Sequence, residues 1–117
     1  MRRLPLMLAV AALTLAALAG THWAPTDEAT AAQSAYVSMQ FNRFSPRDIV
    51  VSAGTTVMWT NEDWDSGEFH DVIAADGSFY SDPFAPGESV SFTFDVPGYY
   101  EYYCDFHEGM YGSITVQ

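Results

Sequence analysis

The chain has 117 residues, and its 15 acidic residues outnumber four basic ones, which gives a formal net charge of −11. We therefore expect no nucleic-acid or anionic membrane partner, since both repel a chain of this charge. The length is enough to close the core of one small β-sandwich but not of two.

The first 19 residues have the features of a secretory signal peptide. Residues 1–3 are basic, residues 4–19 are almost wholly apolar, and residues 17–19 form a small-x-small cleavage site. The apolar run is shorter than the ~20 residues that a membrane-spanning helix needs. We expect residues 1–19 to be removed and residues 20–34 to form a flexible segment. The mature protein would then be exported, without a membrane span, to the periplasm or another extracytoplasmic space.

The rest of the sequence predicts short β-strands and no helix. Apolar and polar residues alternate over residues 37–41 and 89–96, as in strands with one buried face. Further β-rich runs follow Gly- and Pro-containing breaks and cover residues 49–51, 55–60, 99–104 and 113–116. Strands of this length and spacing predict an all-β domain over residues 35–117, a Greek-key antiparallel β-sandwich or barrel.

A short segment near the C-terminus holds three potential metal ligands. Cys104 is the only cysteine, His107 follows three residues later, and Met110 three residues after that. A second histidine, His70, lies upstream. One thiolate, two imidazoles and a weak axial thioether suit a blue-copper electron-transfer centre.

Strand alternation predicts how two of these ligands are oriented. Cys104 shares a strand face with Tyr100 and Tyr102, and His70 shares one with Val72, which should belong to the core. Both side chains should therefore point inward near one end of the sandwich.

Each potential ligand also has a simpler interpretation. A single cysteine in an exported chain has no intramolecular disulfide partner, so Cys104 is an intermolecular bridge, an inert buried thiol or a ligand. Histidines are often surface or core residues, and methionines often fill gaps in a core. The neighbouring His107 and Met110 favour the ligand interpretation. A lone cysteine also excludes a binuclear copper site, which needs two.

Other residues of the same types are assigned different roles. Met39 and Met58 lie in strand patterns and are expected to pack in the core, and His22 lies in a polar segment. Asn61 and Asp71 are candidates for orienting the ligands through hydrogen bonds.

The order of these motifs resembles the plastocyanin/amicyanin branch of the cupredoxins, over about residues 36–117. The resemblance is carried by residues 54–61, His-Asp-Val at 70–72, Pro-Gly-Tyr at 97–99, and Cys-x-x-His-x-x-Met-x-Gly at 104–112. The short Cys-to-Met spacing is more similar to amicyanin than to plant plastocyanin. The resemblance implies a cupredoxin-like fold and one copper ion, cycling between Cu(I) and Cu(II), with the metal ligands His70, Cys104, His107 and Met110.

The chain also departs from the pattern of that family. Phe69 and Phe106 stand where proline is common, and the acidic segment 62–68 is longer than in amicyanin. Tyr103 resembles the aromatic residue through which plastocyanins pass electrons. These departures leave the ligand set intact but change the surface around it.

The resemblance implies a small soluble type 1 copper protein that carries single electrons between redox protein partners. We expect a monomer. We also expect that the protein is not an enzyme, because four ligands leave no open position for a substrate. Two alternatives stay open, an extracytoplasmic copper chaperone or scavenger and a non-metal β-sandwich interaction module. The acidic surface, with Glu62, Asp63, Asp65 and Glu68 beside the site, fits steering toward a basic partner and adaptation to a saline habitat equally well.

Overall fold

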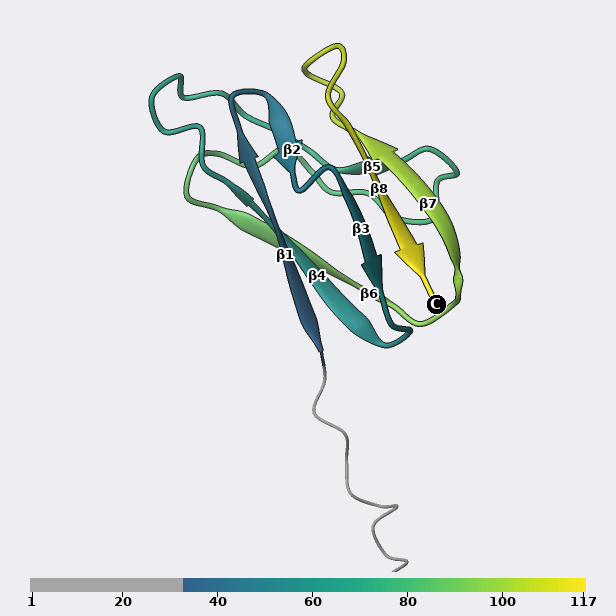
Figure 1. Ribbon diagram of the computed structural model, residues 1–117. Helices are drawn as coiled ribbons and strands as arrows, with labels where there is room; N and C mark the ends of the chain where they lie inside the picture. Colours follow the sequence, from purple (N-terminus) through teal and green to yellow (C-terminus); the bar gives the residue numbers. More distant parts are fainter. Residues whose placement is uncertain (1–32) are drawn as a thin grey trace, which may run out of the picture. The chain divides into compact units, whose positions relative to one another are not determined.

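The computed structural model describes residues 33–117, which form a sandwich of two four-stranded sheets (Figure 1). These residues contain eight strands and no helix. The predicted signal peptide and nearly all of the predicted flexible segment lie outside the described residues. The first strand begins at Ser34, one residue before the predicted start of the domain. No membrane-crossing helix is found in the described part of the chain.

The two sheets have the strand orders β2-β1-β4-β6 and β3-β8-β7-β5. The strands of the first sheet are β1 Ser34–Gln40, β2 Arg43–Ser45, β4 Thr55–Asn61 and β6 Ser89–Phe94. Those of the second sheet are β3 Asp48–Val51, β5 Ile73–Ala74, β7 Gly98–Tyr103 and β8 Tyr111–Val116.

Both sheets are mixed. Four strand pairs are antiparallel, but β1 pairs with β4 and β3 pairs with β8 in parallel. Between β1 and β4 the chain crosses to the second sheet as β3, so β4 returns to the first sheet in the direction of β1. The predicted all-β sandwich is confirmed, but two of its six strand pairs are parallel and depart from the predicted antiparallel pattern.

Alternate residues of the central strands form the core between the sheets. In β4 every second residue from Thr55 to Asn61 is buried. Trp59 packs edge-on against Tyr102 of the opposite sheet, with the ring centroids 5.3 Å apart. Of the two methionines predicted to pack in the core, Met39 is fully buried, whereas Met58 lies on the other face of β4 and is only partly buried. The aromatic contact between the sheets fixes the end of β7, directly before Cys104.

The predicted alternation is wrong beyond two strand ends. Phe41 and Val96 were expected to continue buried faces, but they are 75% and 65% exposed. Strand β1 ends at Gln40, and β6 ends at Phe94. Phe41 instead opens a two-residue turn to β2, in which both residues have positive φ angles.

Gly112 has no side chain, and this leaves room for the ring of Tyr102. It pairs with Tyr102 between β8 and β7. A Cβ atom at Gly112 would overlap the phenol of Tyr102 and lie 2.8 Å from the carbonyl oxygen of Arg47. A side chain here would displace either the ring or the backbone between β2 and β3.

We predict that Gly112→Ala lowers the free energy of unfolding by about 1–3 kcal/mol, the usual cost of overpacking a core. Urea unfolding followed by tryptophan fluorescence measures the loss. Gly98→Ala on β7 is the matched control, because its Cβ would have no neighbour closer than 3.6 Å. Equal losses for the two variants would show that the close fit of Gly112 against Tyr102 does not matter.

Candidate metal centre

The loop between β7 and β8 carries three of the four predicted ligands and is fixed at both ends. Tyr103 and Tyr111, which flank the loop, are paired across the two strands. The amide of Cys104 donates to the carbonyl of Met110 at 3.1 Å, and the amide of Met110 donates to the carbonyl of His107 at 3.3 Å. In Figure 1 this loop lies at the end of the sandwich opposite the C-terminus. The backbone of all three residues is therefore set by the β7–β8 pair.

His70 is held by backbone bonds to a different segment. Its amide donates to the carbonyl of Phe84 at 3.2 Å, and the amide of Phe84 donates back at 2.8 Å. This isolated bridge lies outside the named strands, so His70 does not come from a strand as expected. The side chain of Asn61 donates to the carbonyls of Glu68 and Phe84 at 2.9 and 3.0 Å. Asn61 thereby holds the loop that contains His70 in place.

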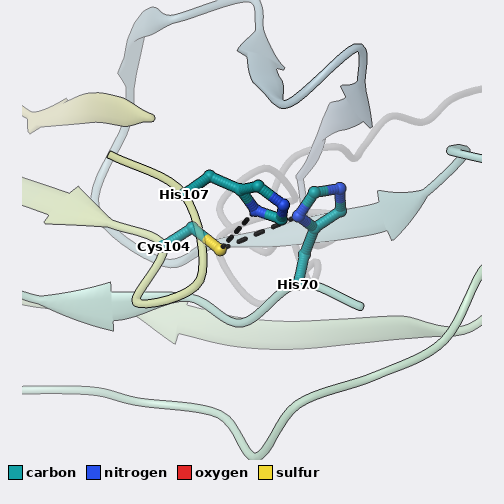
Figure 2. Close-up of side chains that lie close together, drawn as sticks. All are labelled: His70, Cys104 and His107. Carbon is teal, nitrogen blue, oxygen red and sulfur yellow. Dashed lines mark hydrogen bonds between the residues drawn. The ribbon is translucent and has the colours of Figure 1, made fainter. Parts of the chain in front are cut away.

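The donor atoms of three predicted ligands lie close together (Figure 2). Sγ of Cys104 lies 3.7 Å from Nδ1 of His70 and 3.8 Å from Nδ1 of His107. All three donor atoms lie within 4.8 Å of one another. Cys104 and His70 are buried, and the side chain of His107 is 15% exposed. The predictions that Cys104 and His70 point inward are confirmed.

The spacing of these donors fits a single metal ion. A transition metal of the size of zinc binds imidazole nitrogen at about 2.0 Å and thiolate sulfur at about 2.3 Å, which places two such donors about 3.5–3.8 Å apart. The two observed sulfur–nitrogen distances, 3.7 and 3.8 Å, agree with this separation. The mixture of one soft thiolate and two imidazoles is the donor set that suits copper.

Met110 is buried and is the last residue of the same loop. Its amide and carbonyl bond to His107 and Cys104, so its backbone is fixed beside both ligands. Its role as the axial ligand stays a prediction.

Burial disfavours a negative charge on the sulfur of Cys104 as long as no cation is bound. Burial raises the pKa of the Cys104 thiol, and hydrogen bonds from the backbone amides of Asp71 and Phe106 to the sulfur only partly oppose this shift. Since metals bind the thiolate, a bound cation supplies the charge that holds this buried sulfur deprotonated.

Asp71 and Asn61, the two residues expected to orient the ligands, bind backbone amides next to the site rather than the ligand imidazoles. Asp71 accepts a hydrogen bond from the amide of Asp105 at 2.7 Å, which ties the His70 segment to the Cys104 loop. Asn61 accepts one from the amide of Asp63 at 2.9 Å. Neither is a hydrogen-bond partner of a ligand imidazole.

The direct partner of His70 is Asp63, which sequence reasoning placed among the surface acids. Oδ2 of Asp63 lies 2.6 Å from Nε2 of His70, and Asp63 is only 6% exposed. No local sequence pattern distinguishes Asp63 from the neighbouring acids, because its backbone donors, Phe41 and Asn42, lie more than twenty residues away in the chain. On the other histidine, Nε2 of His107 lies 3.6 Å from Oε2 of Glu68.

Comparison with known proteins identifies relatives of this chain. A family model described as a cupredoxin-like domain matches residues 6–116. A plastocyanin from Scenedesmus fuscus is 38% identical over 84 residues, which cover 63% of this chain and 86% of that protein. The chain spans about half the length of several chloroplastic plastocyanins that it also matches, between 49% and 58%.

Two solved structures show the same fold. A purple cupredoxin from Nitrosopumilus maritimus is 30% identical with a TM-score of 0.64, over 71% of this chain and 99% of that chain. A mutant of amicyanin in its oxidized state has a TM-score of 0.65 over 79% of this chain and 88% of that chain. At 23% identity, the amicyanin likeness concerns the fold alone.

Proposed function

Because the chain belongs to the cupredoxin-like family, we propose that it is a type 1 (blue) copper protein that carries single electrons between redox protein partners. Family membership confirms the predicted resemblance to plastocyanin and amicyanin, and with the donor cluster it confirms copper as the cofactor. The observation that carries the proposal is the convergence of the donor atoms of Cys104, His70 and His107.

A bound copper ion supplies a one-electron couple, and the chain supplies a rigid and largely water-free environment for it. His70 and Cys104 are buried, and both are held by backbone hydrogen bonds to neighbouring segments. Such ligands have little freedom to rearrange when the charge of the ion changes. A small rearrangement of the ligands between the two oxidation states favours fast electron transfer in both directions, which a carrier requires.

His107 offers the shortest route from the site to the surface. Its Nδ1 faces the sulfur of Cys104, while its Nε2 lies near Glu68, which is 46% exposed. Phe106, whose ring centroid lies 6.5 Å from that of His107, is 51% exposed, and Phe69, which precedes His70 in the chain, is 49% exposed, so apolar side chains are exposed next to both histidine ligands. Met110 of the same loop is buried and contributes no surface. A partner that docks on this apolar end could approach the ligand closely.

The carrier function is favoured over the three other possibilities. A chaperone or scavenger must exchange its ion readily, whereas two of the three clustered ligands here are buried. An interaction module without metal leaves the convergence of three donors without a reason. An enzyme needs an open coordination position, which a fourth ligand from Met110 would close.

We also propose an exported monomer that meets a basic partner. Export rests on the leader-like residues 1–19, and the choice of partner rests on the net charge of −11. Asp65 and Glu108 are exposed close in sequence to the two histidine ligands. Asp63 is buried against His70 and does not belong to this acidic surface, which corrects the set expected from sequence.

The first test is the colour of the copper-loaded protein. We predict that addition of Cu(II) gives one ion per chain and a strong visible band, because charge moves from the thiolate of Cys104 to the metal. Cys104→Ser should remove the band. A reversible one-electron couple in voltammetry would separate a carrier from a chaperone. A colourless, weakly bound Cu(II) form would contradict the proposal.

Met110 should tune the reduction potential without being essential for binding, since the axial bond of such sites is long and weak. We predict that Met110→Leu keeps the visible band and raises the potential, because loss of a sulfur donor disfavours Cu(II). Met110→Gln should lower it. Voltammetry at fixed pH measures both, and an unchanged potential for Met110→Leu would show that another group is axial.

Steering by the acidic surface should appear in the salt dependence of electron transfer. We predict that the bimolecular rate with a basic redox protein falls steeply as salt rises, since the Debye length is roughly 8 Å at physiological ionic strength. Asp65→Asn combined with Glu108→Gln should flatten this dependence.

The matched control combines Asp76→Asn with Asp95→Asn. Both residues are exposed, and Asp95 lies before the start of β7, whereas Cys104 follows the other end of that strand. This variant loses the same charge but should keep a steeper dependence on salt. A wild-type rate that ignores salt would leave adaptation to a saline habitat as the better explanation of the acidity.

A further inference from the structure

Asp63 is a buried carboxylate that binds a metal ligand and a surface turn at the same time. Its Oδ2 lies 2.6 Å from Nε2 of His70. Its Oδ1 accepts from the amide of Phe41 at 2.6 Å, and Oδ2 also accepts from the amide of Asn42 at 3.3 Å. Its own amide donates to Oδ1 of Asn61 at 2.9 Å. Three hydrogen bonds from two segments therefore hold the carboxylate, and a fourth holds the backbone of Asp63.

The contact with Asp63 determines which nitrogen of His70 faces the metal position. Nδ1 of His70 faces the sulfur of Cys104 at 3.7 Å, so Nδ1 is the nitrogen available to a shared ion. The proton of the neutral imidazole then resides on Nε2, which donates it to the carboxylate of Asp63. Rotation of the ring by half a turn would break this bond. Asp63 thus holds the ring in the orientation that copper requires.

The carboxylate of Asp63 faces three hydrogen-bond donors. Nε2 of His70 and the amides of Phe41 and Asn42 share its two oxygen atoms, and such donors stabilise the ionised form of a buried carboxyl group. A charged acceptor makes the imidazole a stronger donor to the metal. The negative charge of Asp63 and the stronger imidazole donor both favour Cu(II), the more highly charged state of the ion.

The turn between β1 and β2 depends on the same carboxylate. Phe41 and Asn42 have φ angles of 57° and 55°, the left-handed region that disfavours a bulky residue such as Phe41. A two-residue hairpin needs this conformation at both positions. Asp63 accepts the amide hydrogens of both turn residues, and the turn in return supplies two donors that keep the carboxylate in place.

We propose that Asp63 is a positioning residue of the copper centre, which fixes His70 with Nδ1 toward the ion and lowers the reduction potential through its charge. This inference rests on the proposed function, since a potential exists only if the site holds copper. It adds a residue that is not a ligand to those that set the redox behaviour.

The test compares the reduction potential of Asp63→Asn with that of Asp65→Asn. Both variants lose one negative charge from the same loop, but Asp65 is exposed and has no bond to a ligand. We expect Asp63→Asn to raise the equilibrium constant for reduction at least tenfold, which is about 59 mV for a one-electron couple. Asp65→Asn should change it much less. Equal potentials for the two variants would overturn the proposal.

Two further measurements keep the test decisive if Asp63→Asn destabilises the turn. Phe41→Gly removes the steric cost of the positive φ angle, so Asp63→Asn can be measured in that background. A double variant with the potential of Phe41→Gly alone would also overturn the proposal. In the wild-type Cu(I) protein, NMR should find a slowly exchanging proton on Nε2 of His70. Absence of that proton would contradict the assigned orientation.

Failure of this inference can be told apart from failure of the proposed function. A wild-type protein without a visible band or a reversible couple would refute the copper carrier itself. A wild-type protein with both, whose potential does not respond to Asp63→Asn, would refute only the role of Asp63.

Discussion

The metal centre depends on how β7 and β8 are joined. The Tyr103–Tyr111 pair and the bond from the Cys104 amide to the Met110 carbonyl close a loop that is too short to adopt many conformations. The core contact of Tyr102 with Trp59 fixes the end of β7 against the opposite sheet. The thiol therefore has one position, and the remaining ligands are arranged around it.

The second constraint is the hydrogen-bonded network that begins at Asn61. This fully buried amide ends β4 and bonds to the chain on both sides of His70, while its oxygen orients Asp63. Buried polar groups are costly unless every one is satisfied, and here they bond to one another and to backbone. The network connects the turn after β1, the loop after β4 and His70. A loop of acidic residues thereby becomes part of a rigid site rather than a mobile surface segment.

The fold and the clustered ligands could be predicted because both produce local patterns in the sequence. Alternation placed Tyr102 and Cys104 on one inward face, and the spacing of the ligands is that of one short loop. Sequence reasoning failed for Phe41 and Val96, because apolar alternation does not show where a strand stops pairing. It also treated Asp63 as a surface charge. Burial of a carboxylate depends on donors from Phe41 and Asn42, which lie more than twenty residues away in the chain.

The central claim is that the chain holds its ligands in one arrangement for both oxidation states. X-ray absorption at the copper edge, on one sample before and after reduction at neutral pH, measures this most directly. The claim predicts one short sulfur and two nitrogen ligands in both states, with nearly unchanged distances. Loss of a nitrogen ligand on reduction, or a large change in the copper–sulfur distance, would contradict it.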